Sequence, residues 1–307
     1  MRNKRAVFYV IIVFTILLLF SLRCHKEEVI KNWDDIGPIW SSDAHYIAFT
    51  RVNRSLNPYP WQDTLKRDSL TGLRILDLSS LKVIDSLTSS FCVDWSPNDD
   101  EILCSDGRIY NVKDHTQKVI FDTSEHYYPQ DWSGDGTRIL CTRENNSPDS
   151  SMILMVDSLG TYSKILFNSG VAPSWHPSGK ELVFIATLNS KKAICIGDTN
   201  GNIKKVIDVE VGDLVPFYGR GPRFSPDGSK ILYFVYQFKD GGFDDFNIYI
   251  CDTSGQNHTK LIDGVHPFWS PSDSKIVFAR YSPQDSEFFS SIWIMDVNGT
   301  NLKKITE

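Results

Sequence analysis

The stretch that decides the fold is GPRFSPDGSKILYF, residues 221–234, followed by NIYICD, residues 247–252. Phe224 ends a short apolar segment, and Ser225-Pro226-Asp227-Gly228 then supplies a tight reversal. Proline presets φ, aspartate caps backbone N–H groups, and glycine accepts positive φ. Two apolar strands, Ile231–Phe234 and Asn247–Asp252, follow this turn. The stretch therefore predicts antiparallel strands joined by a defined turn.

The same unit occurs six times along the chain, each copy marked by an aromatic anchor before the turn. Successive anchors are 55, 37, 43, 49 and 45 residues apart, centred on the 40–50 residues of a four-stranded propeller blade. The strands after the turns are apolar on both faces, as expected of strands packed between neighbouring blades. We predict an all-β, six-bladed propeller. The anchors are Trp40, Trp95, Trp132, Trp175, Phe224 and Trp269.

The repeated Pro-x-Trp-Ser-Pro-Asp-Gly, a strand such as Lys-Ile-x-Phe, and then Ile-Tyr-x-x-Asp resemble the WD-like repeat of the TolB family. The resemblance covers Asp34 to Glu307 and implies six blades of four antiparallel strands around a channel. TolB also carries a separate domain before its propeller, whereas this propeller starts soon after Cys24. The Tol-system partnership of the family therefore cannot be carried over whole.

The first 24 residues differ from the rest. Three basic residues precede an unbroken apolar run, residues 6–22, which is the pattern of an export signal or membrane anchor. Three alternatives remain open: lipidation at Cys24, an uncleaved anchor, or cleavage and release. Arg23 stands where a lipobox normally has a small residue. We predict a leader or anchor at residues 1–24, a spacer at 25–33 and the propeller at 34–307, located in the cell envelope outside the cytoplasm.

Charge and cysteine usage exclude further classes. Four of the 32 Lys and Arg lie in residues 1–24, and all 38 Asp and Glu lie beyond them, so residues 25–307 carry a net charge of −10. Such an acidic domain lacks the basic surface that nucleic-acid binding requires. Apart from Cys24 there are five cysteines without CxxC spacing. We expect buried free thiols, no metal and no cofactor.

Ring closure has two possible forms. Residues 302–306 can complete blade six from its own repeat, so no borrowed strand is required. Alternatively, Val29 to Trp33 adds an outer strand as a clasp. Blade two has a tight hairpin at residues 105–110 where the other blades have a longer loop.

Four insertions are expected on the face opposite the anchor turns: residues 52–72, 211–220, 239–246 and 282–290. Variable loops on a rigid scaffold commonly carry binding sites, and exposed aromatic side chains supply contact area with few rotamers to freeze. The aromatic binding candidates here are Trp61, Phe217 and Tyr218. The alternative is that these rings fold back over their own loops.

A second set of candidates lies near the channel. Asp94 and Asp131 each precede an anchor tryptophan, Arg223 holds that position in blade five, and Arg220 and His266 lie a few residues before their anchors. Two carboxylates and two arginines could bind a charged peptide or a cation. The alternative is that these charges are solvated or paired with one another.

Sequence signatures of catalysis are absent: there is no Gly-x-Ser-x-Gly, P-loop or His-Glu-x-x-His. We predict a monomeric, membrane-tethered binding module without catalytic residues, which presents its loop face to an envelope protein or peptide. The alternative is a hydrolase or lyase at the channel mouth, acting on a carbohydrate or peptide with or without a metal. That alternative requires Asp94, Asp131, Arg223 and His266 to converge on one point.

Overall fold

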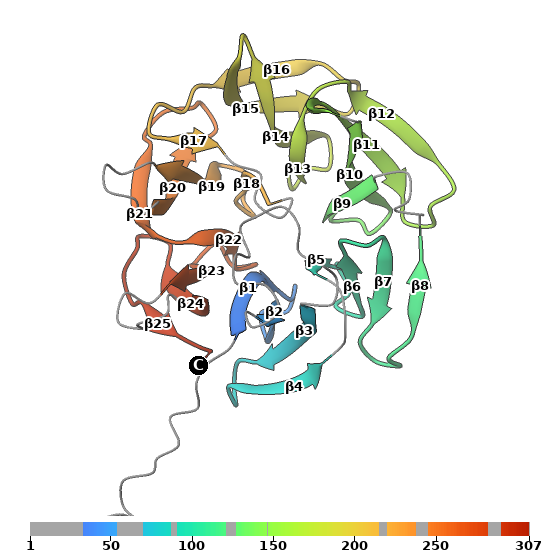
Figure 1. Ribbon diagram of the computed structural model, residues 1–307, viewed down its shortest axis with the longest axis vertical. Coiled ribbons are helices and arrows are strands. Elements are labelled where there is room, and N and C mark those ends of the chain that lie inside the picture. The colour runs from blue at the N-terminus through green and yellow to red at the C-terminus, as the bar shows by residue number, and fades with distance from the viewer. Residues whose placement is uncertain are drawn as a thin grey trace, which may run out of the picture. The chain divides into compact units, whose positions relative to one another are not determined.

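The computed structural model describes residues 33–53, 70–86, 91–120, 127–145, 147–214, 220–237, 245–281 and 290–306. Six antiparallel sheets follow one another along residues 33–306 and surround a central axis, as Figure 1 shows. Each sheet comes from one sequence repeat, and its strands are ordered from the axis outward as they occur in the chain. The prediction of a six-bladed propeller with four-stranded blades is confirmed.

The first three blades have simple up-and-down order. Blade 1 contains β1 Trp33–Trp40, β2 Tyr46–Asn53, β3 Leu70–Asp77 and β4 Lys82–Ser86. Blade 2 contains β5 Cys92–Trp95, β6 Glu101–Cys104, β7 Arg108–Asn111 and β8 Gln117–Val119. Blade 3 contains β9 Tyr127–Trp132, β10 Arg138–Asn145, β11 Ser147–Asp157 and β12 Ser163–Phe167. The tight hairpin predicted in blade 2 is the connection between β6 and β7.

The remaining blades keep this order with one interruption. Blade 4 contains β13 Val171–Trp175, β14 Glu181–Leu188, β15 Lys191–Asp198 and β16 Ile203–Ile207. Blade 5 contains β17 Asp213–Leu214, β18 Arg223–Phe224, β19 Lys230–Gln237, β20 Asp245–Asp252 and β21 Thr259–Asp263. Blade 6 contains β22 Val265–Trp269, β23 Lys275–Tyr281, β24 Ser290–Asp296 and β25 Lys303–Lys304.

The inner strand of blade 5 is split, which corrects one expectation. Residues 211–220 were expected to form a loop insertion on the face opposite the anchor turns, but Asp213 and Leu214 pair with Tyr236 and Val235 of β19. Arg223 and Phe224 pair with the same strand further along. The insertion therefore interrupts the innermost strand, and Arg220 lies at its far end.

The hydrophobic core is divided among the interfaces between blades. One cluster of buried side chains joins blades 1 and 2, another joins blades 2 and 3, and a third joins blades 3 and 4. Blades 4 and 5 share a fourth cluster, and the largest links blades 5, 6 and 1. Because each sheet is covered on both faces, three consecutive buried apolar residues follow the first residue of its second strand, as the sequence predicted.

In the part of the chain that the structure describes, the ring closes by packing of blade 1 against blade 6. Strand β1 contacts β22, β23 and β24 of blade 6. Blade 6 obtains its outer strand β25 from its own repeat, which confirms the first of the two closure hypotheses. Trp33 belongs to the inner strand β1, and Val29 to Asn32 lie outside the described residues.

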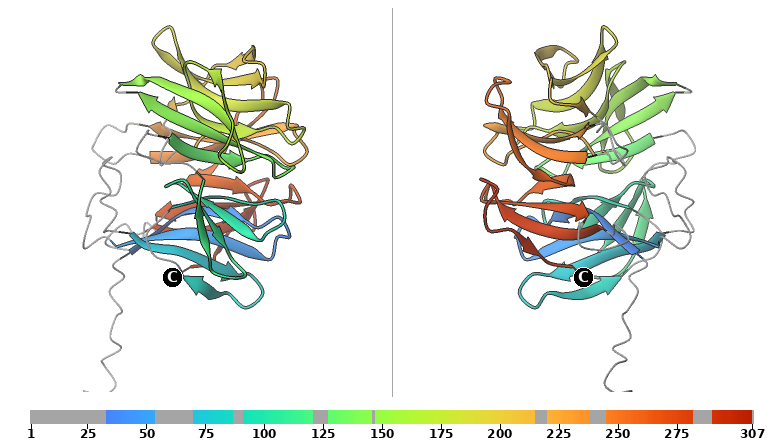
Figure 2. Two further views of the ribbon diagram at one scale, coloured as in Figure 1. Left: turned by 90° about the vertical axis from the view of Figure 1, so that its right-hand side faces the viewer. Right: turned by 60° about the vertical axis from the view of Figure 1, so that its left-hand side comes forward.

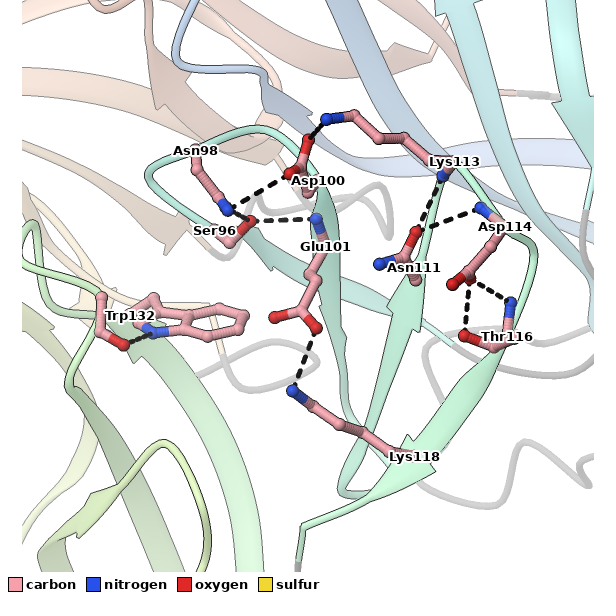
Figure 3. A network of polar contacts seen from close by, with 11 residues as sticks. Ser96, Asn98, Asp100, Glu101, Asn111, Lys113, Asp114, Thr116, Lys118 and Trp132 are labelled. Carbon is pink, nitrogen blue, oxygen red and sulfur yellow. Dashed lines mark hydrogen bonds and ion pairs between the residues drawn. The ribbon is translucent and has the colours of Figure 1, made fainter.

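The anchor turns are held by side-chain hydrogen bonds. In blade 2 the Ser96 hydroxyl donates to Asn98 Oδ1 (2.6 Å) and accepts from the N–H of Glu101 (2.9 Å), as Figure 3 shows. In blade 5 the Ser225 hydroxyl donates to Asp227, which accepts from the N–H of Ser229. All six anchors are buried. The predicted structural role of these turn residues is confirmed.

In blade 4, His176 stabilises the anchor turn in the place of the serine. Its Nδ1 lies 2.8 Å from the Ser178 hydroxyl and accepts from the Ser178 N–H. Its ring also packs edge-on against Phe224 of the next blade. The five cysteines beyond Cys24 are free and buried, as expected.

Candidate functional site: channel and loop face

The two aspartates predicted near the channel join neighbouring blades. Asp94 of blade 2 accepts a hydrogen bond from the backbone N–H of Trp132 in blade 3 (2.8 Å). Asp131 of blade 3 accepts in the same way from the N–H of Trp175 in blade 4 (2.6 Å) and from the Ser174 hydroxyl. An innermost strand has no further strand to pair its N–H groups. The aspartate that precedes the anchor of one blade therefore accepts a hydrogen bond from the backbone N–H of the anchor in the next blade.

Arg223 spans the channel. It extends from blade 5 to Asp131 in blade 3, with 2.5 Å between Nη1 and Oδ1, and it also donates to the carbonyl of Gln130. Its guanidinium lies 4.4 Å from the ring centre of Phe268 in blade 6. Both members of the ion pair are buried. One side chain thus ties together three blades.

Arg220 and His266 meet at Gly37 in the bulged inner strand of blade 1. Arg220 donates to the carbonyls of Gly37 (3.1 Å) and Cys92 (2.7 Å), so blade 5 also reaches blades 1 and 2. The N–H of Gly37 donates to Nδ1 of His266 from blade 6 (3.3 Å). Since Nδ1 accepts this bond, the imidazole that fits the contact is the neutral tautomer with its proton on Nε2.

Burial in the channel shifts the pKa values of Asp94 and Arg220 toward their neutral forms. Burial, with the nearby charge of Asp131, raises the pKa of Asp94 to about 8. Burial, with the positive charge of Arg223, lowers the pKa of Arg220 to about 10, so Arg220 stays cationic near neutral pH. Asp131 pairs with Arg223, so Asp94 is the carboxyl that holds a proton there.

Among the five predicted channel residues, Arg223 binds Asp131 directly, and Arg220 and His266 meet at Gly37. Asp94 binds the backbone N–H groups of Trp95 and Trp132. Within the described ranges, no three His, Cys, Asp or Glu side chains form a group that could hold a metal ion. The arrangement as it stands holds six blades in register, and a ligand-binding role for these residues stays a prediction.

The aromatic candidates Trp61, Phe217 and Tyr218, the lipidation candidate Cys24 and the leader lie outside the described residues. The strand ends that bound their loops are described: β2 to β3 bounds residues 54–69, and β17 to β18 surrounds 215–222. Since strands alternate direction, the β2–β3 connection opens on the face opposite the anchor turns. That face is called the loop face below. The described part of the chain contains no apolar helix of a length that could cross a membrane.

Three arginines at one repeat position were missed by the sequence analysis. Arg51, Arg143 and Arg280 each stand 11 residues after their anchor, near the loop-face end of a second strand. Each guanidinium lies over an aromatic ring: Trp33 at 4.8 Å, Tyr127 at 5.1 Å and Trp293 at 5.5 Å, respectively. Comparison of the six repeats position by position could have revealed this periodic arginine.

The partners of these arginines differ between blades. Arg51 forms two hydrogen bonds with Asp35 (2.6 and 2.9 Å), and Arg280 forms two with Asp263 (2.8 and 2.9 Å). In blade 3 the cross-strand partner of Arg143 is Tyr127, where blade 1 pairs Arg51 with Asp35. Among the described residues no carboxylate is bonded to Arg143.

Comparison with known proteins agrees with the fold. No protein-family model matches the chain. An uncharacterised protein of Agrobacterium fabrum is 24% identical over 298 residues, covering 86% of this chain and 92% of that protein.

Two solved structures are similar over most of the propeller. TolB from Acinetobacter baumannii superposes with a TM-score of 0.64 at 20% identity, over 83% of this chain and 62% of that one. A putative TolB from Agrobacterium tumefaciens gives a TM-score of 0.60 at 20% identity, over 76% of this chain and 87% of that one. The chain thus matches less than two thirds of the first protein. Residues 33–306 have the six-bladed propeller fold of the TolB proteins.

Proposed function

We propose that this chain is a binding module of the cell envelope that uses its loop face to hold a protein or peptide partner. The proposal rests on a difference between the channel and the loop face: the channel side chains bind groups of the chain, whereas the loop face carries the variable connections. Inside the channel, Asp131, Arg220 and Arg223 bind one another or backbone groups across the ring. The sequence variation between repeats is concentrated in the connections of the opposite face, on a rigid scaffold, where binding sites commonly lie.

The alternative, a hydrolase or lyase at the channel mouth, is less well supported. General acid–base chemistry requires a side chain that can reach a substrate proton. Both oxygens of Asp94 accept from backbone N–H groups, of Trp95 and Trp132. Asp131 binds Trp175, Ser174 and Arg223. Since the oxygens of both aspartates bind groups of the chain itself, we infer that these residues stabilise the fold and are not catalytic.

The proposed location rests on the leader. A basic head followed by an apolar run of 17 residues fits an export signal or anchor. We propose that residues 25–32 connect this leader to the propeller on the outer side of the membrane, with Cys24 as the lipidation candidate. Mass spectrometry of the membrane-extracted protein distinguishes a lipidated Cys24 from an intact N-terminus.

The test is a crosslinking pull-down of the full chain in cells, repeated with a purified version that begins at His25 and is added to isolated cell envelopes. Capture of one dominant envelope protein by both supports a binding module whose partner does not depend on the anchor. Capture of no specific protein by either contradicts the proposal and directs attention to a small ligand or substrate at the channel mouth.

A further inference from the structure

We propose that Arg143, stacked on Tyr127 at the loop face, is a binding site for a carboxylate of the protein or peptide partner. The inference deepens the proposed function, on which it rests, by naming the chemistry that the partner must supply. It follows from a comparison of three equivalent arginines in one chain.

In blades 1 and 6 the arginine at this repeat position is bound by a carboxylate of the chain. Arg51 and Arg280 are partly buried, with 22% and 19% of their side chains exposed, and each lies over an aromatic ring. In both blades a carboxylate of the chain binds the guanidinium through two parallel hydrogen bonds. Planar two-point binding of this kind is the preferred partnership of arginine and carboxylate.

Among the described residues, blade 3 keeps the arginine and the ring, and no carboxylate takes the place of Asp35 or Asp263. Arg143 is partly buried, and its cross-strand neighbours are Tyr127 in β9 and Met152 in β11. Neither neighbour can offer a carboxylate. Withdrawing a guanidinium from water without an anion is unfavourable, so a carboxylate brought by another molecule gains the hydrogen bonds that Asp35 and Asp263 supply elsewhere.

The surroundings suit a peptide. Strands β10 and β11 form a hairpin in which Asn145 pairs with Ser147, two residues beyond Arg143. Figure 2 shows this hairpin, in green, reaching to one side of the disc. An approaching chain would meet the planar guanidinium, held in place by the Tyr127 ring at 5.1 Å. The side-chain carboxylate of an acidic residue and a free C-terminal carboxylate share the required chemistry.

The experiment measures the rate at which phenylglyoxal modifies each arginine of the full chain in neutral detergent, followed by peptide mapping. Three N-acetylated probes are compared: tetraglutamate with an amidated C-terminus, a serine–glycine peptide with a free carboxylate, and its amide. Ionic strength is fixed with chloride. We expect at least one carboxylate probe to slow modification of Arg143 about fivefold or more, while Arg51 and Arg280 are unaffected. The first two probes distinguish an acidic side chain from a C-terminus.

Two substitutions provide an internal control. Tyr127→Asp installs the carboxylate that blade 1 has at this position, so Arg143 should become protected without any probe and should lose its response to the probes. Tyr127→Asn removes the ring without adding charge and should not protect Arg143. If no probe slows Arg143 relative to chloride, or if both substitutions protect it equally, the proposal is wrong.

Failure of this site can be separated from failure of the proposed function. In the pull-down, Arg143→Gln should reduce capture of the partner about tenfold, whereas Arg280→Gln should leave it unchanged. A partner captured equally by wild type and Arg143→Gln overturns the carboxylate site and leaves the binding module intact. A wild-type chain that captures nothing contradicts the proposed function, while the phenylglyoxal result still decides whether Arg143 binds carboxylates.

Discussion

At the residue scale, the buried charges of the channel are organised by position within the repeat. The residue before the anchor is Asp in blades 2 and 3 and Arg in blade 5. The aspartates satisfy the exposed backbone edge of the next blade, and Arg223 neutralises one of them across the channel. One carboxyl, Asp94, then remains close to a second carboxyl in a buried site, and its proton affinity rises accordingly.

Protonation of Asp94 should make the free energy of unfolding depend on pH. The pKa of Asp94 is about 8 in the folded chain, against about 4 for an unfolded aspartate. Between these values the folded state binds the extra proton, so the free energy of unfolding should fall as pH rises, on the order of 1 kcal/mol per pH unit. Urea unfolding from pH 5 to 8 should show this slope in wild type and a flatter profile in Asp94→Asn.

A matched control is Asp114→Asn. Asp114 is exposed and accepts from the Thr116 hydroxyl and N–H, which lowers its pKa. Any contribution of Asp114 is therefore lost only as pH falls below about 4. Its replacement should leave the slope between pH 5 and 8 as in wild type. Parallel profiles for wild type and Asp94→Asn would show that Asp94 is ionised throughout this range.

The cross-channel ion pair should matter far more than a surface pair. Arg223→Met leaves the buried carboxylate of Asp131 without its cation, at a cost of about 3–5 kcal/mol in the free energy of unfolding. Lys275→Met removes an exposed pair with Asp296 of similar length (2.7 Å) and should cost less than about 1 kcal/mol. Chemical denaturation at pH 7 measures both, and equal costs would argue against a structural role for the channel pair.

Local roles at this scale could be predicted from the sequence, whereas distant ones could not. The turn function of Asp227 follows from neighbours within a few residues, so composition and spacing predict it. Arg223 and Asp131 are 92 residues apart, and nothing local selects that partner. The proximity of both to the channel could be predicted from the repeat, but their pairing depends on the tertiary arrangement of blades 3 and 5.

At the scale of elements, neighbouring blades are fixed at the rim as well as at the channel. In blades 3 to 6 the turn before the outer strand lies against the preceding blade. Lys164 and Lys205 donate to carbonyls of two of these turns (2.8 and 3.1 Å). Gly160 occupies this turn in blade 3 with φ +71°, and a Cβ there would collide with the carbonyl oxygen of Ile120 in blade 2. The contact leaves room for glycine alone.

Two glycines at the same repeat position allow the stability cost of a positive φ to be distinguished from the cost of a steric clash. Gly160→Ala and Gly299→Ala both place a side chain at positive φ (+71° and +83°). At Gly299 the new Cβ would lie 3.5 Å from the carbonyl oxygen of Leu261, an ordinary contact. Thermal or urea unfolding should therefore show Gly160→Ala to be more destabilising by about 1–3 kcal/mol. Similar losses for the two would mean that the rim contact adds nothing.

The strand pattern was predictable because each blade repeats the same alternation of anchor, turn and apolar strand. The split inner strand of blade 5 could not be predicted from the sequence. Its first part, Asp213–Leu214, is only two residues long and pairs with residues more than 20 positions later. A pairing this short has no periodicity that sequence analysis can detect.

At the scale of the whole molecule, the described residues close the ring by contacts between blades 6 and 1. Asp34 of β1 accepts from the N–H (2.6 Å) and hydroxyl (3.0 Å) of Ser290 in blade 6. His266 of blade 6 and Arg220 of blade 5 hold the two backbone groups of Gly37. The channel is thus used to secure the ring, and we expect binding at the loop face.

The measurement that tests this most directly is site-specific photocrosslinking in cells from one exposed position on each face. Lys191, at the start of β15, lies beside the loop face of blade 4, and Ser272 lies in the anchor turn of blade 6. A photoreactive residue at position 191 should yield a discrete adduct with the partner, and one at position 272 should yield none. An adduct from position 272 alone would contradict binding through the loop face.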